Sequence, residues 1–372
     1  MIDPSLLTPE TRLYLRPIWF AESPVGLDGR TARMGSGLIW FQGYEVTARH
    51  DGVIQRDRVA VAEFDDWCGL VIEPLAVRAR TLAANIAAIR SPLAVRERMI
   101  RFDVPQLMGI LKMTPESFSD GGKHLADPQA AADAGFAMMV AGAAIVDVGG
   151  ESTRPRAEKV WEGDEIARIV PVIEWLAAAG VPVSVDTRKA AVMEAALAAG
   201  AGIVNDISAL LHDPRSIEVV ARAECPVVLM HAPSTGDDPH EGGEYQDVVT
   251  DVFDWLEARI AACEAAGITR EKIIVDPGLG FGKSLAANLA IMSRLALYQG
   301  LGVPVLLGAS RKRMIGALSN EAAANVRLGG SLTLALRGVD AGMQMLRVHD
   351  VPETVQLVHV WRGLRDAALV TG

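Results

Sequence analysis

The pattern of hydrophobic positions changes near residue 105. Before that point, short apolar runs at 12–16, 37–41 and 59–62 are separated by Gly, Pro and Asp, which predicts short strands joined by turns. Residues 76–91 have a helical pattern, and Pro92 is expected to end that helix. After residue 105, apolar runs of a few residues alternate with longer Ala-rich amphipathic stretches, which is typical of parallel β–α–β units.

Eight such units are expected. The predicted strands are 106–111, 144–148, 182–186, 202–206, 226–230, 272–276, 304–308 and 344–348. The predicted helices are 128–141, 163–179, 189–199, 214–223, 246–266, 286–299, 322–339 and 351–368. This count predicts the α/β class, a (β/α)8 TIM barrel over 106–372, preceded by a small α+β extension of unassigned role over 1–105. A doubly wound open sheet is the alternative, but the chain lacks the Rossmann glycine fingerprint.

Composition narrows the class of protein. The chain has 372 residues, of which 50% are hydrophobic, so it has the composition of a globular protein. No apolar run is long enough to span a membrane, and a net charge of −10 argues against nucleic acid as a partner. The three cysteines are widely spaced and the N-terminus has no secretory pattern, so a cytoplasmic location is expected.

Each predicted barrel strand is followed by polar or charged residues. In a TIM barrel the carboxyl ends of the strands form the active site. A single Asp after a strand, such as Asp206 or Asp350, is often only the N-cap of the next helix. Polar residues at all eight strand ends, on the same side of the barrel, argue for a binding or catalytic site.

These strand ends divide into two chemical groups. One group suits the donor edge of a nitrogen heterocycle and consists of Asp186, Asn205, Asp276 and Lys312. The other is rich in cations and donors, suits phosphate or diphosphate, and consists of Thr153, Arg154, Arg347 and His349 with the hydroxyls of the first loop. The glycine-rich run 278–284 matches neither a Walker A motif nor G-x-G-x-x-G, and the isolated His231 is expected to be a packed wall residue.

The order of these motifs resembles the dihydropteroate synthase family over 106–368. The matching stretches are MGILKMTPESFSDGG, DVGGESTRP, SVDT, NDIS, LMH, DPGLGFGK, GASRK and RVHD. The resemblance implies a (β/α)8 barrel, usually a homodimer. It also implies condensation of 7,8-dihydropterin-6-ylmethyl diphosphate with 4-aminobenzoate, with release of diphosphate and assistance from Mg²⁺.

Residue roles follow from the same resemblance. It implies that Asp186, Asn205, Asp276 and Lys312 hold the pterin, with Ile207 and Met230 against its faces. It places Thr153, Arg154, Arg347 and His349 at the diphosphate or in the loops that close over 4-aminobenzoate. Asp186, Lys312, Arg347 and His349 are the predicted catalytic residues. Asp186 would stabilise positive charge on the pterin methylene after diphosphate departs, while the loops after the first two strands close to exclude water.

The chain departs from the family pattern in three places. Lys112 stands where the family has an Asn that helps to place Mg²⁺ and diphosphate, so it either supplies the charge of the ion or disables the site. Arg313 replaces a Ser of the family near the aminobenzoate, and residues 232–238 differ from the usual loop. A diverged paralogue that binds pterin but has lost or changed the condensation is therefore the alternative function. A pterin-dependent methyltransferase ranks below both, because the phosphate-handling first loop and Ser310-Arg311-Lys312 are retained.

Overall fold

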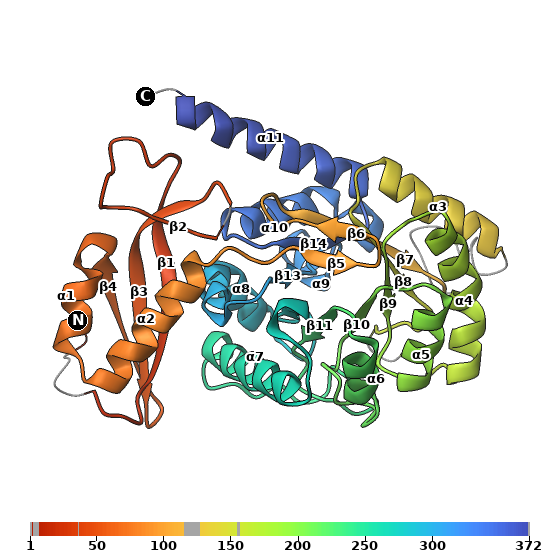
Figure 1. Ribbon diagram of the computed structural model, residues 1–372, viewed down its shortest axis with the longest axis horizontal. Coiled ribbons are helices and arrows are strands. Elements are labelled where there is room, and N and C mark those ends of the chain that lie inside the picture. Colours follow the sequence, from red (N-terminus) through yellow and green to blue (C-terminus); the bar gives the residue numbers. More distant parts are fainter. Residues whose placement is uncertain (1, 3–6, 36, 115–126, 155–156, 371–372) are drawn as a thin grey trace.

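The barrel is a single sheet of eight parallel strands surrounded by helices (Figure 1). The computed structural model describes residues 2, 7–35, 37–114, 127–154 and 157–370. Neighbouring strands follow the order β12-β11-β10-β9-β8-β7-β14-β13, and a parallel bridge between Val275 and Val305 brings the two ends of the sheet together. The predicted TIM barrel is confirmed.

The strands form where the sequence has short apolar runs, because their side chains are buried on both faces of the sheet. Each predicted strand is present to within about two residues. The strands are β7 (Gln106–Lys112), β8 (Ile145–Gly149), β9 (Val183–Asp186), β10 (Ile203–Asp206), β11 (Val227–Met230), β12 (Ile273–Asp276), β13 (Leu306–Leu307) and β14 (Met345–Val348).

Three of the outer helices begin at capping side chains that the sequence supplies. Asp127 and Asp247 each accept two backbone N–H groups at the start of a helix, and Ser284 accepts one. The helices of the barrel are α3 (Pro128–Val140), α4 (Glu162–Ala178), α5 (Ala190–Ala199), α6 (Ser216–Ala223), α7 (Val248–Ala265), α8 (Leu285–Ser293), α9 (Arg313–Leu318), α10 (Leu328–Asp340) and α11 (Val351–Val370).

Two predicted helices differ from the structure. The helix expected over 286–299 ends at Ser293 and continues as a 3-10 helix, η4 (Leu295–Leu301). The helix expected over 322–339 begins only at Leu328, because a separate short 3-10 helix, η5 (Ala324–Val326), occupies the first part of the expected range. The short α9 was not predicted.

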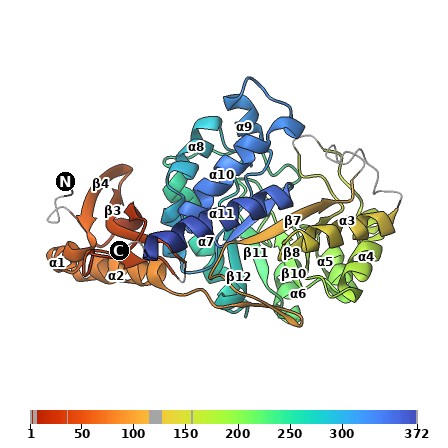
Figure 2. The same cartoon turned by 90° about the horizontal axis from the view of Figure 1, so that it is seen from above.

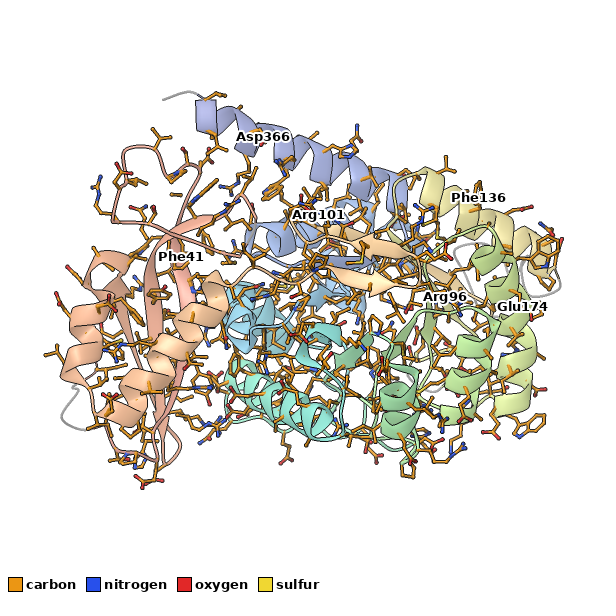
Figure 3. The ribbon with its side chains drawn as sticks, viewed as in Figure 1. Phe41, Arg96, Arg101, Phe136, Glu174 and Asp366 are labelled. Atoms are coloured by element: carbon orange, nitrogen blue, oxygen red, sulfur yellow. The ribbon has the colours of Figure 1, made fainter. Side chains whose placement is uncertain are left out.

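The N-terminal extension is an antiparallel sheet with two helices that packs against one side of the barrel (Figures 1 and 2). The predicted strand at 12–16 is confirmed. The helix predicted over 76–91 is present but runs from Glu73 to Ala87, so it ends five residues before Pro92. The segment 37–41 is mostly loop, and 59–62 is the end of a strand followed by a 3-10 turn. Phe41 is fully buried in the core of the extension, while Asp366 lies on the outer face of α11 (Figure 3). The elements are β1 (Arg12–Ala21), β2 (Ala32–Arg33), β3 (Trp40–His50), β4 (Val53–Ala60), α1 (Phe64–Leu70) and α2 (Glu73–Ala87).

Arginines of the extension pair with acidic residues at the start and along one face of α7. Arg12 lies 2.7 Å from Asp254, Arg56 lies 2.8 Å from Asp247, and Arg78 lies 2.6 Å from Glu257. Beneath these pairs, the Tyr14 ring meets the ring of Phe253 edge to face, with the centroids 5.6 Å apart. The apolar contact and the ion pairs together fix the extension on the barrel.

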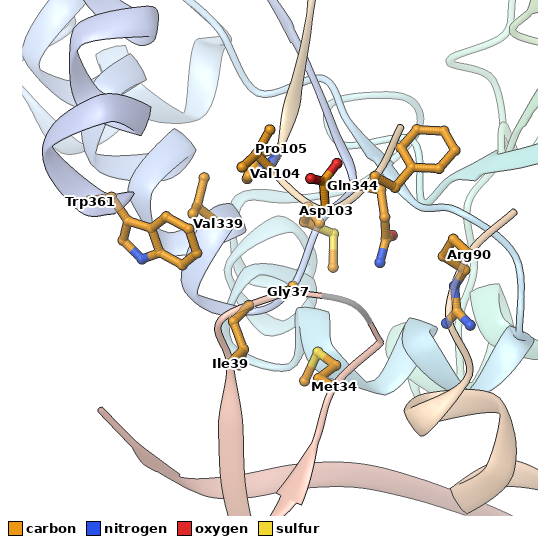
Figure 4. Close-up of a pocket in the computed structure, with 13 residues that line it drawn as sticks. Met34, Gly37, Ile39, Arg90, Asp103, Val104, Pro105, Val339, Gln344 and Trp361 are labelled. Atoms are coloured by element: carbon orange, nitrogen blue, oxygen red, sulfur yellow. The ribbon is translucent and has the colours of Figure 1, made fainter. Parts of the chain in front are cut away.

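A β-hairpin closes the amino-terminal end of the barrel. It consists of β5 (Leu93–Val95) and β6 (Arg98–Ile100), and with Phe102 its buried side chains form one cluster with the first inward-facing residues of the strands, among them Met108 and Ile145. Beside it, a cavity of about 20 Å³ lies between Met34 and Ile39 of the extension and Trp361 of α11 (Figure 4). This volume holds about one water molecule, so the cavity is not a ligand site.

Candidate active site

The polar residues predicted as a site come together at the carboxyl end of the barrel. Asp186 ends β9, Asp276 ends β12, and Asn205 and Arg347 lie one residue before the ends of β10 and β14. The first three side chains are buried, with exposed fractions of 4%, 6% and 6% for Asp186, Asp276 and Asn205. Because all eight strands are parallel, their carboxyl ends form one rim. The sequence predicted this arrangement, since polar residues follow each predicted strand.

Arg347 links two carboxylates at the centre of this rim. Its Nε donates to Oδ2 of Asp147 at 2.7 Å, and its Nη2 donates to Oδ2 of Asp186 at 2.6 Å. Asn205 also donates to Oδ2 of Asp147, at 3.1 Å. Asp147 therefore fixes two of the predicted site residues. It was not predicted as a site residue, although a carboxylate within the buried run 144–148 was a signal that it needs a partner.

Lys112 reaches into the same cluster from the end of β7. Its ammonium lies 2.5 Å from Oδ2 of Asp186 and 3.4 Å from the carbonyl oxygen of Glu151. The neighbouring strand leaves space for it, since a Cβ atom at Gly149 would lie 2.5 Å from Nζ of Lys112. Oδ2 of Asp186 thus accepts from two cations at once.

The two carboxylates have different ionisation properties. Burial alone raises the pKa of Asp186, but Lys112 and Arg347 outweigh burial and hold this pKa below its usual value. Burial dominates at Asp147 and raises its pKa, although Arg347 opposes the shift. Asp186 is therefore the more readily ionised carboxylate of the pair.

Lys312 approaches the rim from the loop after β13. Its ammonium donates to the carbonyl oxygen of Leu279 and lies 4.5 Å from the centre of the Phe281 ring, within the range of a cation–π contact. Burial lowers the pKa of Lys312 to about 8, although Asp276 favours the charged form. Gly280 has a φ of +80°, and a Cβ atom there would lie 3.1 Å from the Lys312 side chain, so the glycine permits this close approach.

An apolar wall stands next to the polar rim. Ile207 and Met230 form a small buried cluster with Ala232, and Phe281 packs against it. A flat ring bound at the rim would rest against this wall, which agrees with the faces predicted for Ile207 and Met230. Their contact with a ligand stays a prediction.

His349 follows β14 and is held by Ser310. The Ser310 hydroxyl lies 3.0 Å from Nδ1 of His349 and accepts the backbone N–H of the same residue at 3.2 Å. Burial, together with the nearby charge of Arg347, lowers the pKa of His349 to about 3. The imidazole is therefore neutral at pH 7, and the positive charge on this side of the site belongs to arginines, foremost Arg347.

Three loops meet beside Lys312. Nε2 of His240 lies 2.9 Å from the carbonyl oxygen of Thr153, and the His240 ring stacks on Phe281 with the centroids 4.9 Å apart and the planes 9° apart. Neither His240 nor Phe281 was predicted, because a stacking contact between two loops leaves no periodic signal. Thr153 and Arg154 lie in the described part of the first of these loops, whereas residues 115–126 and 155–156, which carry most of the predicted lid, lie outside the described residues.

His231 is a packed wall residue, as predicted. Lys283 donates to its Nδ1 at 2.9 Å and to the carbonyl oxygen of Gly278 at 2.8 Å. Burial and the Lys283 charge lower the pKa of His231 to about 2, and burial lowers the pKa of Lys283 to about 7. The pair fixes the loop that follows β12.

A metal ion would find few free ligands here. Among the residues that the structure describes, no three His, Cys, Asp or Glu side chains come together in a way that could hold a metal ion. Oδ2 of Asp186 and Oδ2 of Asp147 both accept from cationic side chains, and Oδ1 of Asp147 is a buried oxygen without a hydrogen-bond partner. The arrangement around Lys112 does not fit a divalent ion bound to Asp186.

Fold and site together define a (β/α)8 barrel enzyme whose strand ends combine buried carboxylates with cations. The chain matches the pterin binding enzyme family over residues 108–349. It is 44% identical to the dihydropteroate synthase of Neisseria meningitidis serogroup B over 270 residues, which cover 71% of this chain and 94% of that protein. The Escherichia coli K12 dihydropteroate synthase is 44% identical over 257 residues, which cover 69% of this chain and 90% of that protein.

Solved structures of dihydropteroate synthases are also similar to this chain in fold. Xanthomonas albilineans dihydropteroate synthase with 4-aminobenzoic acid has a TM-score of 0.69 at 44% identity, over 74% of this chain and 98% of that one. The same enzyme in complex with 7,8-dihydropteroate has a TM-score of 0.66 at 42% identity, with the same coverage. The chain belongs to the dihydropteroate synthase family and is a transferase.

Proposed function

We propose that the chain condenses 7,8-dihydropterin-6-ylmethyl diphosphate with 4-aminobenzoate at the carboxyl end of the barrel. The products are 7,8-dihydropteroate and diphosphate. The observation that carries this function is the convergence of Asp186, Asn205 and Arg347 on one buried hydrogen-bonded cluster, in a chain of this family. It is the kind of site that orients a polar heterocycle next to an anionic leaving group.

The pterin binds between the polar rim and the apolar wall. The guanidine-like donors of the pterin pair with the carboxylate of Asp276 and the amide oxygen of Asn205, and both side chains are buried. Lys312 donates to the ring from beside the glycine-rich loop, where its ammonium contacts the carbonyl oxygen of Leu279 and the ring of Phe281. Ile207 and Met230 cover one face of the ring.

The reaction breaks the C–O bond between the pterin methylene and diphosphate, and the electron pair leaves with diphosphate. The aniline nitrogen of 4-aminobenzoate then forms the C–N bond and loses one proton. Asp186 stabilises the positive charge on the methylene, because its lowered pKa keeps it ionised. Arg347 and His349 lie on the diphosphate side, and Thr153 and Arg154 belong to the loop that closes over 4-aminobenzoate.

Several finer features stay predictions. A homodimer and assistance from Mg²⁺ rest on the resemblance alone. A cytoplasmic location is supported by three buried cysteines that form no disulfide, Cys68, Cys225 and Cys263. Within the described residues no helix is long and apolar enough to cross a membrane.

The activity is tested by supplying both substrates with Mg²⁺ and following the release of diphosphate. We expect release that requires 4-aminobenzoate as well as the pterin substrate. Calorimetry of pterin binding accompanies the assay. Bound pterin without any release would overturn the condensation and favour a pterin-binding paralogue.

A further inference from the structure

We propose that the ammonium of Lys112 is a resident cation of the diphosphate site, which binds the diphosphate directly and takes the place of a divalent ion there. This inference rests on the proposed function, because that function puts the diphosphate beside Arg347. Lys112 is a position at which this chain departs from its family, and the inference gives Lys112 a role in the reaction.

The position of Lys112 supports the assignment. It is the last residue of β7, where its backbone is in register with Gly149 of β8, and β7 also pairs with β14, which carries Arg347. The ammonium of Lys112 and the guanidinium of Arg347 approach the same oxygen of Asp186, at 2.5 Å and 2.6 Å. Two cations that share one acceptor form a pair that is able to receive an anion.

The number of donors also fits. A lysine ammonium has three N–H groups. In the described structure two of them face acceptors, Oδ2 of Asp186 and, at a longer distance of 3.4 Å, the carbonyl oxygen of Glu151. A third N–H remains for an oxygen of the diphosphate. The side chain is 20% exposed, so a ligand in the surrounding solvent is able to reach the ammonium.

A divalent ion and the ammonium compete for the same place. A magnesium ion at a phosphate site is usually held by one or two carboxylates together with phosphate oxygens and waters. Here the carboxylate of Asp186 already accepts from Lys112, and an ion bound to this oxygen would have to lie beside an ammonium of like charge. Because an ammonium cannot coordinate a metal, Lys112 excludes the ion from Asp186 and supplies one positive charge of its own.

The consequence for catalysis concerns the leaving group. As the C–O bond breaks, negative charge grows on the diphosphate, and fixed cations next to it lower the barrier. Arg347 is held by two carboxylates, whereas Lys112 has one charged partner in the described structure. Lys112 is therefore the cation that has more freedom to follow the diphosphate as its charge grows.

The test uses inorganic diphosphate as the probe and calorimetry as the readout, with the full-length protein. In EDTA we expect wild type to bind diphosphate, with an affinity that changes less than about threefold when Mg²⁺ replaces EDTA. We expect Lys112→Asn to bind about 10- to 100-fold more weakly in EDTA and to recover affinity with Mg²⁺. Lys112→Arg retains a cation and should keep metal-free binding. The matched control is Lys272→Asn, because Lys272 lies before β12 at the opposite end of the barrel.

Two results would overturn the inference. One is equal binding of diphosphate to wild type and Lys112→Asn in EDTA, with Lys112→Asn shown to be folded by its thermal transition. The other is an equal dependence on Mg²⁺ in both proteins. Formation of 7,8-dihydropteroate is measured in parallel. If no product forms although diphosphate binding depends on Lys112, the inference is supported and the proposed activity fails. If product forms with equal need for Mg²⁺ in both proteins, the activity stands and the inference fails.

Discussion

Nε of Arg347 donates to Oδ2 of Asp147 at 2.7 Å, although the two residues are 200 positions apart in the chain. This contact joins β14 to β8 across the rim of the barrel. The same oxygen of Asp147 accepts from Asn205 of β10. Asp147 thus sets the orientation of a cation and an amide that both belong to the site.

Asp147→Asn removes one of the two carboxylates that hold Arg347. Because the partly buried guanidinium of Arg347 keeps only a weaker partner, we expect a loss of about 1–2 kcal/mol in the free energy of unfolding, measured by urea denaturation. The KM for the pterin diphosphate should rise as well, since the common acceptor of Asn205 and Arg347 loses its charge and one of its two oxygens. Asp103→Asn is the matched control, because Asp103 is exposed and its change should stay within about 0.5 kcal/mol. Equal stability of the two variants would contradict the role given to Asp147.

The pKa of Lys312, lowered by burial to about 8, predicts the pH dependence of activity. The charged ammonium of Lys312 is a stronger donor to the pterin than the neutral amine, so kcat/KM for the pterin substrate should fall as pH rises through about 8. Lys312→Arg should move this falling limb upward by more than about one pH unit, because a guanidinium remains protonated. The limb should not move in Lys272→Arg. A limb that stays in place in Lys312→Arg would assign it to another group.

His231 predicts an acid-sensitive stability. Its folded-state pKa is about 2, and an unfolded histidine titrates near about 6.5, so between these values only the unfolded state takes up the proton. The contribution of His231 to stability is complete above about pH 6.5 and is lost as the pH falls. Between about pH 7.5 and about pH 5 the loss amounts to about 2 kcal/mol. His231→Asn should remove this loss of about 2 kcal/mol between about pH 7.5 and about pH 5, measured as the free energy of unfolding at the two pH values.

A substitution in the core beneath the hairpin that closes the barrel should lower stability without reducing catalytic activity. Phe102 is 6% exposed and packs with residues at the amino-terminal ends of the strands. Phe102→Ala should therefore lower the free energy of unfolding, measured by urea denaturation, by about 3 kcal/mol. Met99 is 61% exposed, and Met99→Ala should change stability by no more than about 0.5 kcal/mol. Because the hairpin lies at the end opposite Asp186, kcat of the folded Phe102→Ala protein should be nearly unchanged. A large loss of kcat would show that the two ends are coupled.

The sequence was sufficient to predict what depends on local periodicity. The alternation of apolar runs and amphipathic stretches predicted the eight strands and most of the helices, and the parallel order then brought Asp186, Asn205, Asp276 and Arg347 to one rim. Those side chains were predictable because each follows or ends a strand.

What escaped prediction depends on contacts between distant segments. Asp147 became a site residue only through its hydrogen bonds to Asn205 and Arg347. The stack of His240 on Phe281 joins two loops. The hairpin over 93–100 has strands of three residues each, which are too short for a periodic signal and are fixed by the barrel that they close.

The initial rate of 7,8-dihydropteroate formation by wild type and by Asp186→Asn tests the central claim most directly. Asp186 accepts hydrogen bonds from Lys112 and Arg347, and its ionised carboxylate faces the methylene in the proposed reaction. Wild type is expected to form product from the pterin diphosphate and 4-aminobenzoate, and Asp186→Asn to be about 10²- to 10³-fold slower. Absence of product with wild type, or an undiminished rate with Asp186→Asn, would contradict the account.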